Sequence, residues 1–275
     1  MSADKSDDRE PVKGQMSLNS LSPEAASFLE KQSWEAVPSM FQGLVSEGRP
    51  LLMEIACGPQ SILSKTVQET SGRLTDAVRC APFNGGDLGT SEGLKLILQR
   101  IRLELPTHVW MSPPCGPYSP LQNVNRRDEA QCKALEAKRK WAMRLYQACA
   151  CIVHECVQAG IHVTWEMSER WQGWRLPLIQ KLKARYEFHV ATTKGYSVGL
   201  KDAEGRLMQK GWTVMTTHQR LAESLRSPCR CHTSYQRGRC EGAAASMSER
   251  YTPSYAKSCL LYTSDAADEH RDVWW

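Results

Sequence analysis

The sequence lacks any uninterrupted apolar run of the length that a membrane-spanning helix needs. It also lacks an apolar stretch at its start, because Met1–Arg9 is acidic and polar rather than typical of a secretory signal peptide. We therefore expect an intracellular protein, nuclear or cytoplasmic, with no membrane partner. A strong net charge is absent as well: +5 permits a polyanionic partner without requiring one. None of these features indicates an oligomeric state.

A regular disulfide framework is also missing. The 11 cysteines are an odd number, unevenly spaced and mixed with apolar neighbours, a pattern that favours reduced thiols. One group differs, because Cys229, Cys231, His232 and Cys240 lie together in an arginine-rich segment. Three sulfurs and an imidazole could bind zinc tetrahedrally, although the spacing is not that of a standard zinc finger. A zinc site and a reduced cysteine-rich loop are therefore the two alternatives for this segment.

The chain of 275 residues, 41% of them hydrophobic, is long enough to bury a substantial core. Changes in composition predict five segments along it. Residues 1–20 contain few apolar side chains and are expected to form a disordered tail. The sequence from Cys259 resembles the translation of a sequencing-library adapter, so we expect residues 259–275 to be a non-native tail. Between these ends we predict N-terminal helices over 21–49, a main domain over 50–217 and a Cys/His-rich segment over 218–258.

Apolar strands alternate with amphipathic helices in the first part of the main domain. The first strand is expected in Leu51–Pro59, where it opens through Gly58 into a helix. Further strands are expected over Ala77–Cys80, His108–Met111 and Ile161–Glu166, with helical spacing between the strands. This order predicts an α/β fold with a mostly parallel sheet, whose ligands bind at the carboxyl ends of the strands. Two later segments, Tyr196–Leu200 and Trp212–Thr216, predict strands of a C-terminal antiparallel hairpin.

One long helix is expected between the third and fourth strands. Trp141, Leu145, Cys149, Ile152 and Cys156 recur on one of its faces, which predicts a buried stripe. Basic side chains, among them Lys138, Lys140 and Arg144, fall on the other face. We expect that second face to be solvated and basic.

The first strand ends in Glu54-Ile55-Ala56-Cys57-Gly58-Pro59 and leads into a helix. A glycine between a strand and a helix N-terminus lets a ligand approach the backbone, and the helix dipole favours negative groups. This turn therefore predicts a nucleotide-type site. Only one glycine of the usual set is present, so an ordinary strand-to-helix connection is the alternative.

The third strand runs into Ser112-Pro113-Pro114-Cys115. The two prolines fix φ and remove backbone donors, so the chain must leave the strand along one rigid path. A cysteine held on such a turn is presented to a cleft, unlike one that fills a core. Glu54, Gly58, Asp87 and Cys115 all fall at carboxyl ends of predicted strands, and this convergence predicts a site there.

Several of these segments resemble motifs of the cytosine-5 DNA methyltransferases. Pro113-Pro114-Cys115, Tyr118-Ser119 and Asn125-Arg126-Arg127 resemble the catalytic loop, which reads Pro-Pro-Cys-Gln-x-Phe-Ser and often continues into Asn-Arg. Glu54-Ile55-Ala56-Cys57-Gly58 resembles the cofactor turn Asp-Leu-Phe-x-Gly, and Trp165-Glu166-Met167-Ser168 stands where the family has Glu-Asn-Val. The resemblance covers about residues 50–217 and is closer still to methyltransferase-like segments of algal retroelement polyproteins.

The resemblance implies a Rossmann-like, S-adenosylmethionine-dependent methyltransferase fold for residues 50–217. It implies that the Cys115 thiolate attacks C6 of a cytosine and that Glu166 stabilises or protonates N3, while C5 takes the methyl group. The implied cofactor-binding residues are Glu54, Ile55, Cys57, Gly58, Pro59, Asp87 and Pro114. The implied nucleic-acid-binding residues, for DNA rather than RNA, are Ser119, Asn125, Arg126, Arg127 and Lys210.

The sequence departs from the family pattern at several positions. Ala56 replaces the phenylalanine of the cofactor turn, Gln60 replaces its next glycine, and Met167-Ser168 replaces Asn-Val. The Gln-x-Arg-x-Arg motif is missing, and Arg206, Lys210 or Arg220 could supply its cation. We expect no separate target-recognition domain after the hairpin.

Two other functions are alternatives, the first suggested by these departures and the second by Ser112-Pro113-Pro114. One is a catalytically impaired nucleic-acid-binding or retroelement-associated domain of the same fold. The other is an amino-methylating enzyme, which holds an exocyclic nitrogen with Ser-Pro-Pro and an aromatic residue. Cys115 stands in place of that aromatic residue here.

Overall fold

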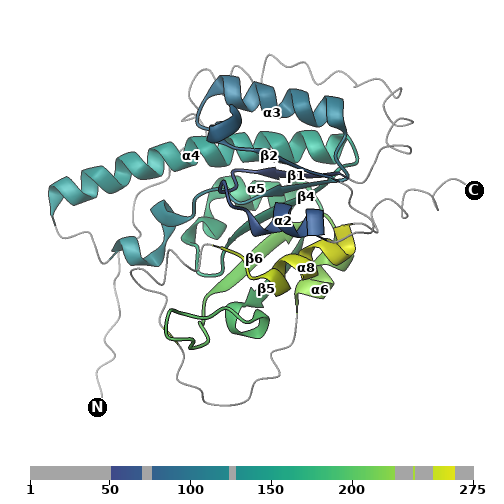
Figure 1. Ribbon diagram of the computed structural model, residues 1–275. Helices are drawn as coiled ribbons and strands as arrows, with labels where there is room; N and C mark the ends of the chain where they lie inside the picture. The colour runs from purple at the N-terminus through teal and green to yellow at the C-terminus, as the bar shows by residue number, and fades with distance from the viewer. Residues whose placement is uncertain (1–50, 70–75, 124–127, 227–237, 239–249, 264–275) are drawn as a thin grey trace, which may run out of the picture. The chain divides into compact units, whose positions relative to one another are not determined.

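A six-stranded mixed sheet forms the centre of the computed structural model, which describes residues 51–69, 76–123, 128–226, 238 and 250–263 (Figure 1). The strand order is β2-β1-β3-β4-β6-β5. The strands are β1 (Leu51–Ile55), β2 (Asp76–Cys80), β3 (His108–Met111), β4 (His162–Ser168), β5 (His189–Lys194) and β6 (Gly211–Thr216). Strands β1 to β4 are parallel, and β6 is antiparallel to both β4 and β5. The predicted α/β class, with a mostly parallel sheet and antiparallel pairing near its C-terminal end, is confirmed.

One strand of the predicted antiparallel hairpin is confirmed, because Trp212–Thr216 lies in β6, and the other strand is built from different residues. Tyr196–Leu200 is not a strand: it contains the 3₁₀ turn η8 (Gly195–Val198), and Gly199 closes that turn with φ of 77°. The strand that pairs with β6 is β5, and its last residue Lys194 pairs with Gly211. The alternating residues Tyr186, Phe188 and Val190, which predict the beginning of a run of strands, lead into this strand, and Val190 is its second residue.

Helices cover both faces of the sheet in two layers. On one face, α3 (Ser91–Glu104) and α5 (Pro177–Arg185) each pack against α4 (Glu129–Gln158). On the other, α2 (Ile62–Glu69) and α6 (Gln219–Leu225) each pack against α8 (Pro253–Thr263). The longer helices begin at side-chain caps, since Thr90 accepts the Gly93 N–H and Asp128 accepts the Gln131 N–H.

Helix α4 is longer than the sheet it covers, and its N-terminal part extends past the strands (Figure 1). Leu145, Cys149, Ile152 and Cys156 lie on the buried stripe as predicted. Trp141 does not, because its side chain is 46% exposed. Its indole nitrogen lies 3.6 Å from the position that a Cβ on Gly89 would take, in the turn before α3. The spacing found the correct helix face, but the neighbouring elements leave half of this indole uncovered.

Aromatic and aliphatic side chains fill the core between the sheet and the α2–α6–α8 layer. Trp110, Trp212 and Tyr255 are among the largest fully or nearly fully buried side chains there. Helix α8 belongs to this core, and it runs through the boundary that the sequence placed at Cys259. Cys259 is 0% exposed and Leu260 is 7% exposed. The predicted segments 1–20 and 21–49 lie outside the described residues, as do residues 264–275.

The sheet contains a change of direction at β1. The chain passes from β1 to β2 on one side and returns across β1 to place β3 on its other side. In parallel sheets of this kind, ligands bind outside the carboxyl ends of the strands at such a switch point. Ile55 of β1 pairs with Met111 of β3 there, and the Ser112 N–H donates to the Ile55 carbonyl at 3.2 Å. The segments that follow β1 and β3 therefore begin side by side.

Candidate functional site

The segment after β1 makes a tight turn into α2. Ala56 has a positive φ of 57°, and its N–H donates to the Cys80 carbonyl of β2 at 2.9 Å. Gly58 and Pro59 are exposed, and a Cβ built on Gly58 would meet no atom within 4 Å. Arg79 donates to the Pro59 carbonyl at 2.6 Å and fixes the far side of the turn. The backbone at Gly58 is thus open to a ligand.

Glu54 and Ser61 connect β1 to the start of α2. The Glu54 carboxylate is 2% exposed and accepts hydrogen bonds from Ser61 Oγ at 2.6 and 2.7 Å and from Ser64 Oγ at 2.6 Å. Burial raises the pKa of Glu54, while the two serines and Arg79 oppose that rise. Its oxygens are satisfied inside the protein, so this acid anchors the turn.

The other predicted cofactor residues near β1 and β2 are backbone and turn positions. Ile55 is fully buried, and the Cys57 side chain is 9% exposed with its thiol pKa raised to about 12, chiefly by burial. Asp87 follows β2, and its carboxylate accepts the Gly89 N–H at 2.8 Å, as expected of a turn residue. All three lie at the carboxyl edge of the sheet, where the sequence placed them.

The loop after β3 carries Cys115. Pro113 is buried, Pro114 is exposed and Cys115 is partly exposed, immediately before the 3₁₀ turn η5 (Gly116–Tyr118). The Tyr118 N–H donates to the Cys115 carbonyl at 3.2 Å, and the Ser119 N–H donates to the Gly116 carbonyl at 3.0 Å. The rigid exit that the two prolines predict is therefore continued by a closed turn.

Helix α4 holds this loop at two carbonyl groups. Tyr146 Oη donates to the Pro114 carbonyl at 2.8 Å, and Arg139 Nε donates to the Pro117 carbonyl at 3.1 Å. The Arg139 guanidinium also lies 5.3 Å from the centre of the Tyr118 ring. Arg139 and Tyr146 are about two turns apart, on one face of the helix. Cys115 is thus flanked on both sides by fixed backbone.

Accessibility separates Cys115 from most other thiols. Of the eight cysteines in the described ranges, six are buried, and only Cys115 and Cys132 are partly exposed. Burial raises the thiol pKa of Cys149 and Cys156 in α4. Cys132 lies near the start of α4, away from the strand ends. Cys115 is therefore the partly exposed thiol that directly follows a strand of the sheet, as a nucleophile would require.

Glu166 lies in β4, next to β3 in the sheet. It is 8% exposed, and burial raises the pKa of its carboxyl to about 7. Hydrogen bonds from Tyr251 and Ser112 and the charge of Lys210 oppose that rise. Tyr251 Oη donates to Glu166 Oε2 at 2.9 Å and lies 2.8 Å from Ser112 Oγ. A carboxyl group that titrates near neutral pH is suited to proton transfer.

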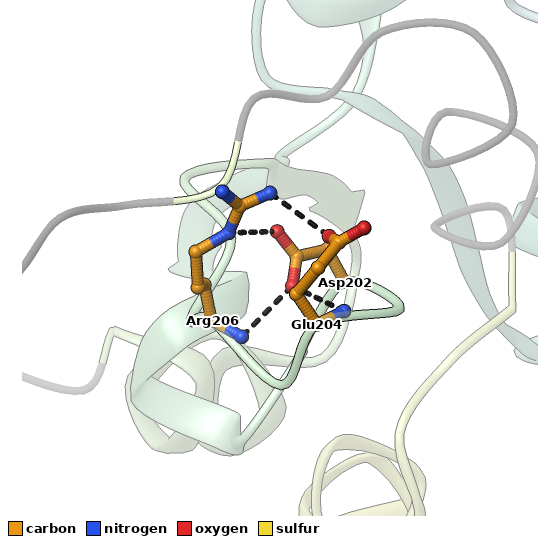
Figure 2. A network of polar contacts seen from close by, with 3 residues as sticks. All are labelled: Asp202, Glu204 and Arg206. Carbon is orange, nitrogen blue, oxygen red and sulfur yellow. Dashed lines mark hydrogen bonds and ion pairs between the residues drawn. The ribbon is translucent and has the colours of Figure 1, made fainter.

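The positions of the three candidate cations differ. Arg206 is engaged within its own turn: it contacts Asp202 and Glu204, each at 2.8 Å (Figure 2). Arg220 is exposed on α6. Lys210, just before β6, acts electrostatically on Glu166. Of the three, Lys210 is the cation whose charge lowers the pKa of Glu166, a predicted catalytic residue.

Several predicted residues lie outside the described ranges, and their arrangement is untested. They are Asn125, Arg126 and Arg127 of the loop and the four zinc candidates Cys229, Cys231, His232 and Cys240. Within residues 51–69, 76–123, 128–226, 238 and 250–263, no three His, Cys, Asp or Glu side chains are arranged to hold a metal ion. In the same ranges, no helix has the length and apolarity needed to cross a membrane.

Sequence reasoning missed Tyr251, Arg139 and Tyr146. The shared helix face of Arg139 and Tyr146 was a usable signal, because both fall two turns apart in a recognised helix. Tyr251 had no such signal, since it is 85 residues from Glu166 in the chain. Comparisons with protein-family models, with curated proteins and with solved structures give no match to this chain.

Proposed function

We propose that this chain is an S-adenosylmethionine-dependent methyltransferase that acts on C5 of cytosine in nucleic acid, with Cys115 as the nucleophile. One observation carries the proposal: Cys115 and Glu166 belong to the carboxyl ends of neighbouring parallel strands, beside the β1–β3 switch point. A partly exposed thiol and a carboxyl group with a pKa of about 7 are the two groups that this chemistry needs.

The turn after β1 fits a small cofactor because the backbone at Gly58 is exposed and open. Gly58, Pro59, Asp87 and Pro114 would hold it at the sheet edge, while Glu54, Ile55 and Cys57 support the turn from within. S-adenosylmethionine supplies the methyl group. The hydroxyl groups of Ser61 and Ser64 donate to Glu54. We therefore assign cofactor binding to the exposed backbone of the turn and not to these two side chains.

The protein residues activate the base. The Cys115 thiolate adds to C6, and the electron pair of the C5–C6 double bond moves toward N3, which takes a proton from Glu166. Carbon C5 would then accept the methyl group that the cofactor supplies, with S-adenosylhomocysteine as the leaving group, and N3 would return its proton to Glu166. Loss of the C5 proton to a base and expulsion of the Cys115 thiolate restore the double bond. Glu166 regains its proton, which its pKa of about 7 permits near neutral pH.

We propose nucleic acid, and not free cytosine, as the substrate because α4 presents an extended basic surface. A free base would not need such a surface, whereas the phosphates of a nucleic acid could bind to it. Lys138, Lys140 and Arg144 are exposed on that helix, whose N-terminal part extends past the strands (Figure 1). Such a surface would contact phosphates, together with Ser119, Lys210 and Asn125–Arg127. A base within a duplex must be flipped to reach Cys115. We propose DNA rather than RNA as the substrate.

Methyl transfer tests this function. The purified chain is incubated with cofactor carrying a labelled methyl group and with cytosine-containing DNA or RNA, and the label in the nucleic acid is counted. Cys115→Ala should abolish transfer, while Cys132→Ala, at the other partly exposed cysteine, should leave it unchanged. Robust transfer by the Cys115→Ala variant would refute the covalent mechanism.

A second function is favoured by a separate observation. Both acids that the resemblance assigns to ligands make hydrogen bonds inside the protein: Glu54 with two serines and Glu166 with Tyr251. This arrangement would suit a catalytically impaired nucleic-acid-binding or retroelement-associated domain. Calorimetry that detects no S-adenosylmethionine binding, with retained salt-sensitive DNA binding, would favour this function over the first.

A further inference from the structure

Tyr251, outside the segment that resembles the methyltransferases, lies against Glu166. Its hydroxyl donates to Glu166 Oε2 at 2.9 Å and accepts a hydrogen bond from Trp110 Nε1 at 3.1 Å. It also lies 2.8 Å from Ser112 Oγ, three positions before Cys115 in the chain. The same hydroxyl thus contacts both β4 and the exit from β3.

The Tyr251 ring is held firmly in this position. It packs edge-on against Trp110, at a centroid distance of 6.2 Å, and against Trp212, at 5.8 Å. Thr252, the next residue, donates to the Val198 carbonyl at 2.8 Å and accepts the Tyr255 N–H at 3.1 Å. Tyr255 is fully buried and stacks on Trp212 at 4.8 Å. A side chain anchored in this way is part of the fold.

The hydrogen bonds have one consistent direction. Burial raises the pKa of Tyr251 well above its usual value, so the phenol stays neutral and has a single proton to donate. The Trp110 N–H is a donor only, and it is shared between the Tyr251 oxygen and Ser112 Oγ, each at 3.1 Å. The phenol proton is then directed to the ionised Glu166 carboxylate.

We propose that Tyr251 is a positioning residue of the site, which holds Oε2 of Glu166 and, together with Ser112, orients this carboxyl group toward the substrate base. This inference rests on the proposed function, because it assigns the base contact to Glu166. It adds a residue from the segment just before α8 to a site that the sequence confined to residues 50–217. Residues near the C-terminal end of the described chain would therefore be needed for the chemistry.

The ionisation of Glu166 gives this role a measurable consequence. Three groups act on Glu166: Tyr251, Lys210 before β6 and Ser112 after β3. Tyr255 and Cys259 of α8 face it as well, and the charge of Glu166 raises the pKa of both. A hydrogen bond to a carboxylate favours its charged form. Removing the Tyr251 hydroxyl should therefore raise the Glu166 pKa further, by about one pH unit.

The test compares Tyr251→Phe with Tyr255→Phe in the full chain. Both variants keep the aromatic ring and remove one phenol oxygen from the same cluster, but it is Tyr251 that donates to Glu166. Glu166 protonation is followed by infrared difference spectroscopy of the carboxyl stretch, with Glu166→Gln to assign the band. We expect the titration midpoint to rise in Tyr251→Phe and to stay in place in Tyr255→Phe.

Equal midpoints in the wild type and Tyr251→Phe would overturn the proposal, as would an equal rise in Tyr255→Phe. If methyl transfer is detected, the pH at which its rate falls on the alkaline side should rise by the same amount in Tyr251→Phe. If the wild type transfers no methyl group, the proposed function fails, while the infrared titration still decides whether Tyr251 controls Glu166. If Tyr251→Phe does not fold, Trp110→Phe provides a second test, because it removes the N–H that donates to Tyr251. We expect the Glu166 titration midpoint to rise in this variant too, by a smaller amount.

Discussion

Replacing Glu166 with glutamine tests the burial of this carboxyl without any assay of activity. Glutamine has nearly the same shape, and its side-chain oxygen can still accept the hydrogen bond from Tyr251. It cannot ionise. The variant therefore removes one property, the cost of holding a negative charge in a site where the wild-type residue is 8% exposed.

The expected size and sign follow from the shifted pKa. The Glu166 pKa is raised from 4.5 to about 7, so the folded state holds this proton more tightly than the unfolded state does. Its contribution to stability is fully present below pH 4.5 and is lost as the pH rises through 7. The difference in pKa corresponds to about 3 kcal/mol of unfolding free energy.

Urea unfolding of both proteins at several pH values, followed by tryptophan fluorescence, measures this difference. Other titrating groups are shared, so they cancel when the variant is compared with the wild type at each pH. We expect the glutamine variant to gain stability over the wild type between pH 4.5 and pH 8, by about 3 kcal/mol in total. Parallel stability curves for the two proteins would refute the assignment of a buried, proton-binding carboxyl at position 166.

Three further changes test the scaffold of the site. Gly93→Ala places a Cβ 2.0 Å from the Asp87 carbonyl oxygen, so a thermal melt should show a loss of about 1–3 kcal/mol; an unchanged melting temperature would contradict this close approach. Ser64→Ala removes a 2.6 Å hydrogen bond to the buried Glu54 carboxylate, and urea unfolding should report a loss of about 1–3 kcal/mol. Tyr146→Phe removes the 2.8 Å bond to the Pro114 carbonyl; we expect about 1 kcal/mol less stability and faster alkylation of Cys115 by iodoacetamide, and an unaltered alkylation rate would argue against the hold of α4 on the loop.

Much of the fold was predictable because its signals are local. The parallel strands are short apolar runs bounded by turns, and α3 and α4 begin at side-chain caps. The pairing of β6 with both β4 and β5 was not predictable in detail, since strand order depends on contacts between distant segments. Trp141 shows a related limit: periodicity assigns a helix face, but it does not say which neighbouring elements cover that face.

The candidate site divides in the same way. The exit of β3 was readable because two prolines and a closed turn are local features that determine where Cys115 lies. The partners of Glu54 and Glu166 were not readable to the same degree. Ser61 and Ser64 are close to Glu54 in the chain, but serines near a helix start usually indicate a cap. Tyr251 lies 85 residues from Glu166 and has no motif of its own.

The two helical layers each hold one of the proposed catalytic groups. Helix α4, on one face of the sheet, fixes the backbone around Cys115 through Arg139 and Tyr146. Helix α8 belongs to the layer on the opposite face. Tyr251, just before α8, holds the side chain of Glu166 through a hydrogen bond. The two groups belong to neighbouring strands, because β3 leads into the loop that carries Cys115 and β4 carries Glu166. The motif that follows β3 can therefore identify Cys115 from the sequence. The surroundings of Glu166 depend on Tyr251, which lies far from that motif in the chain.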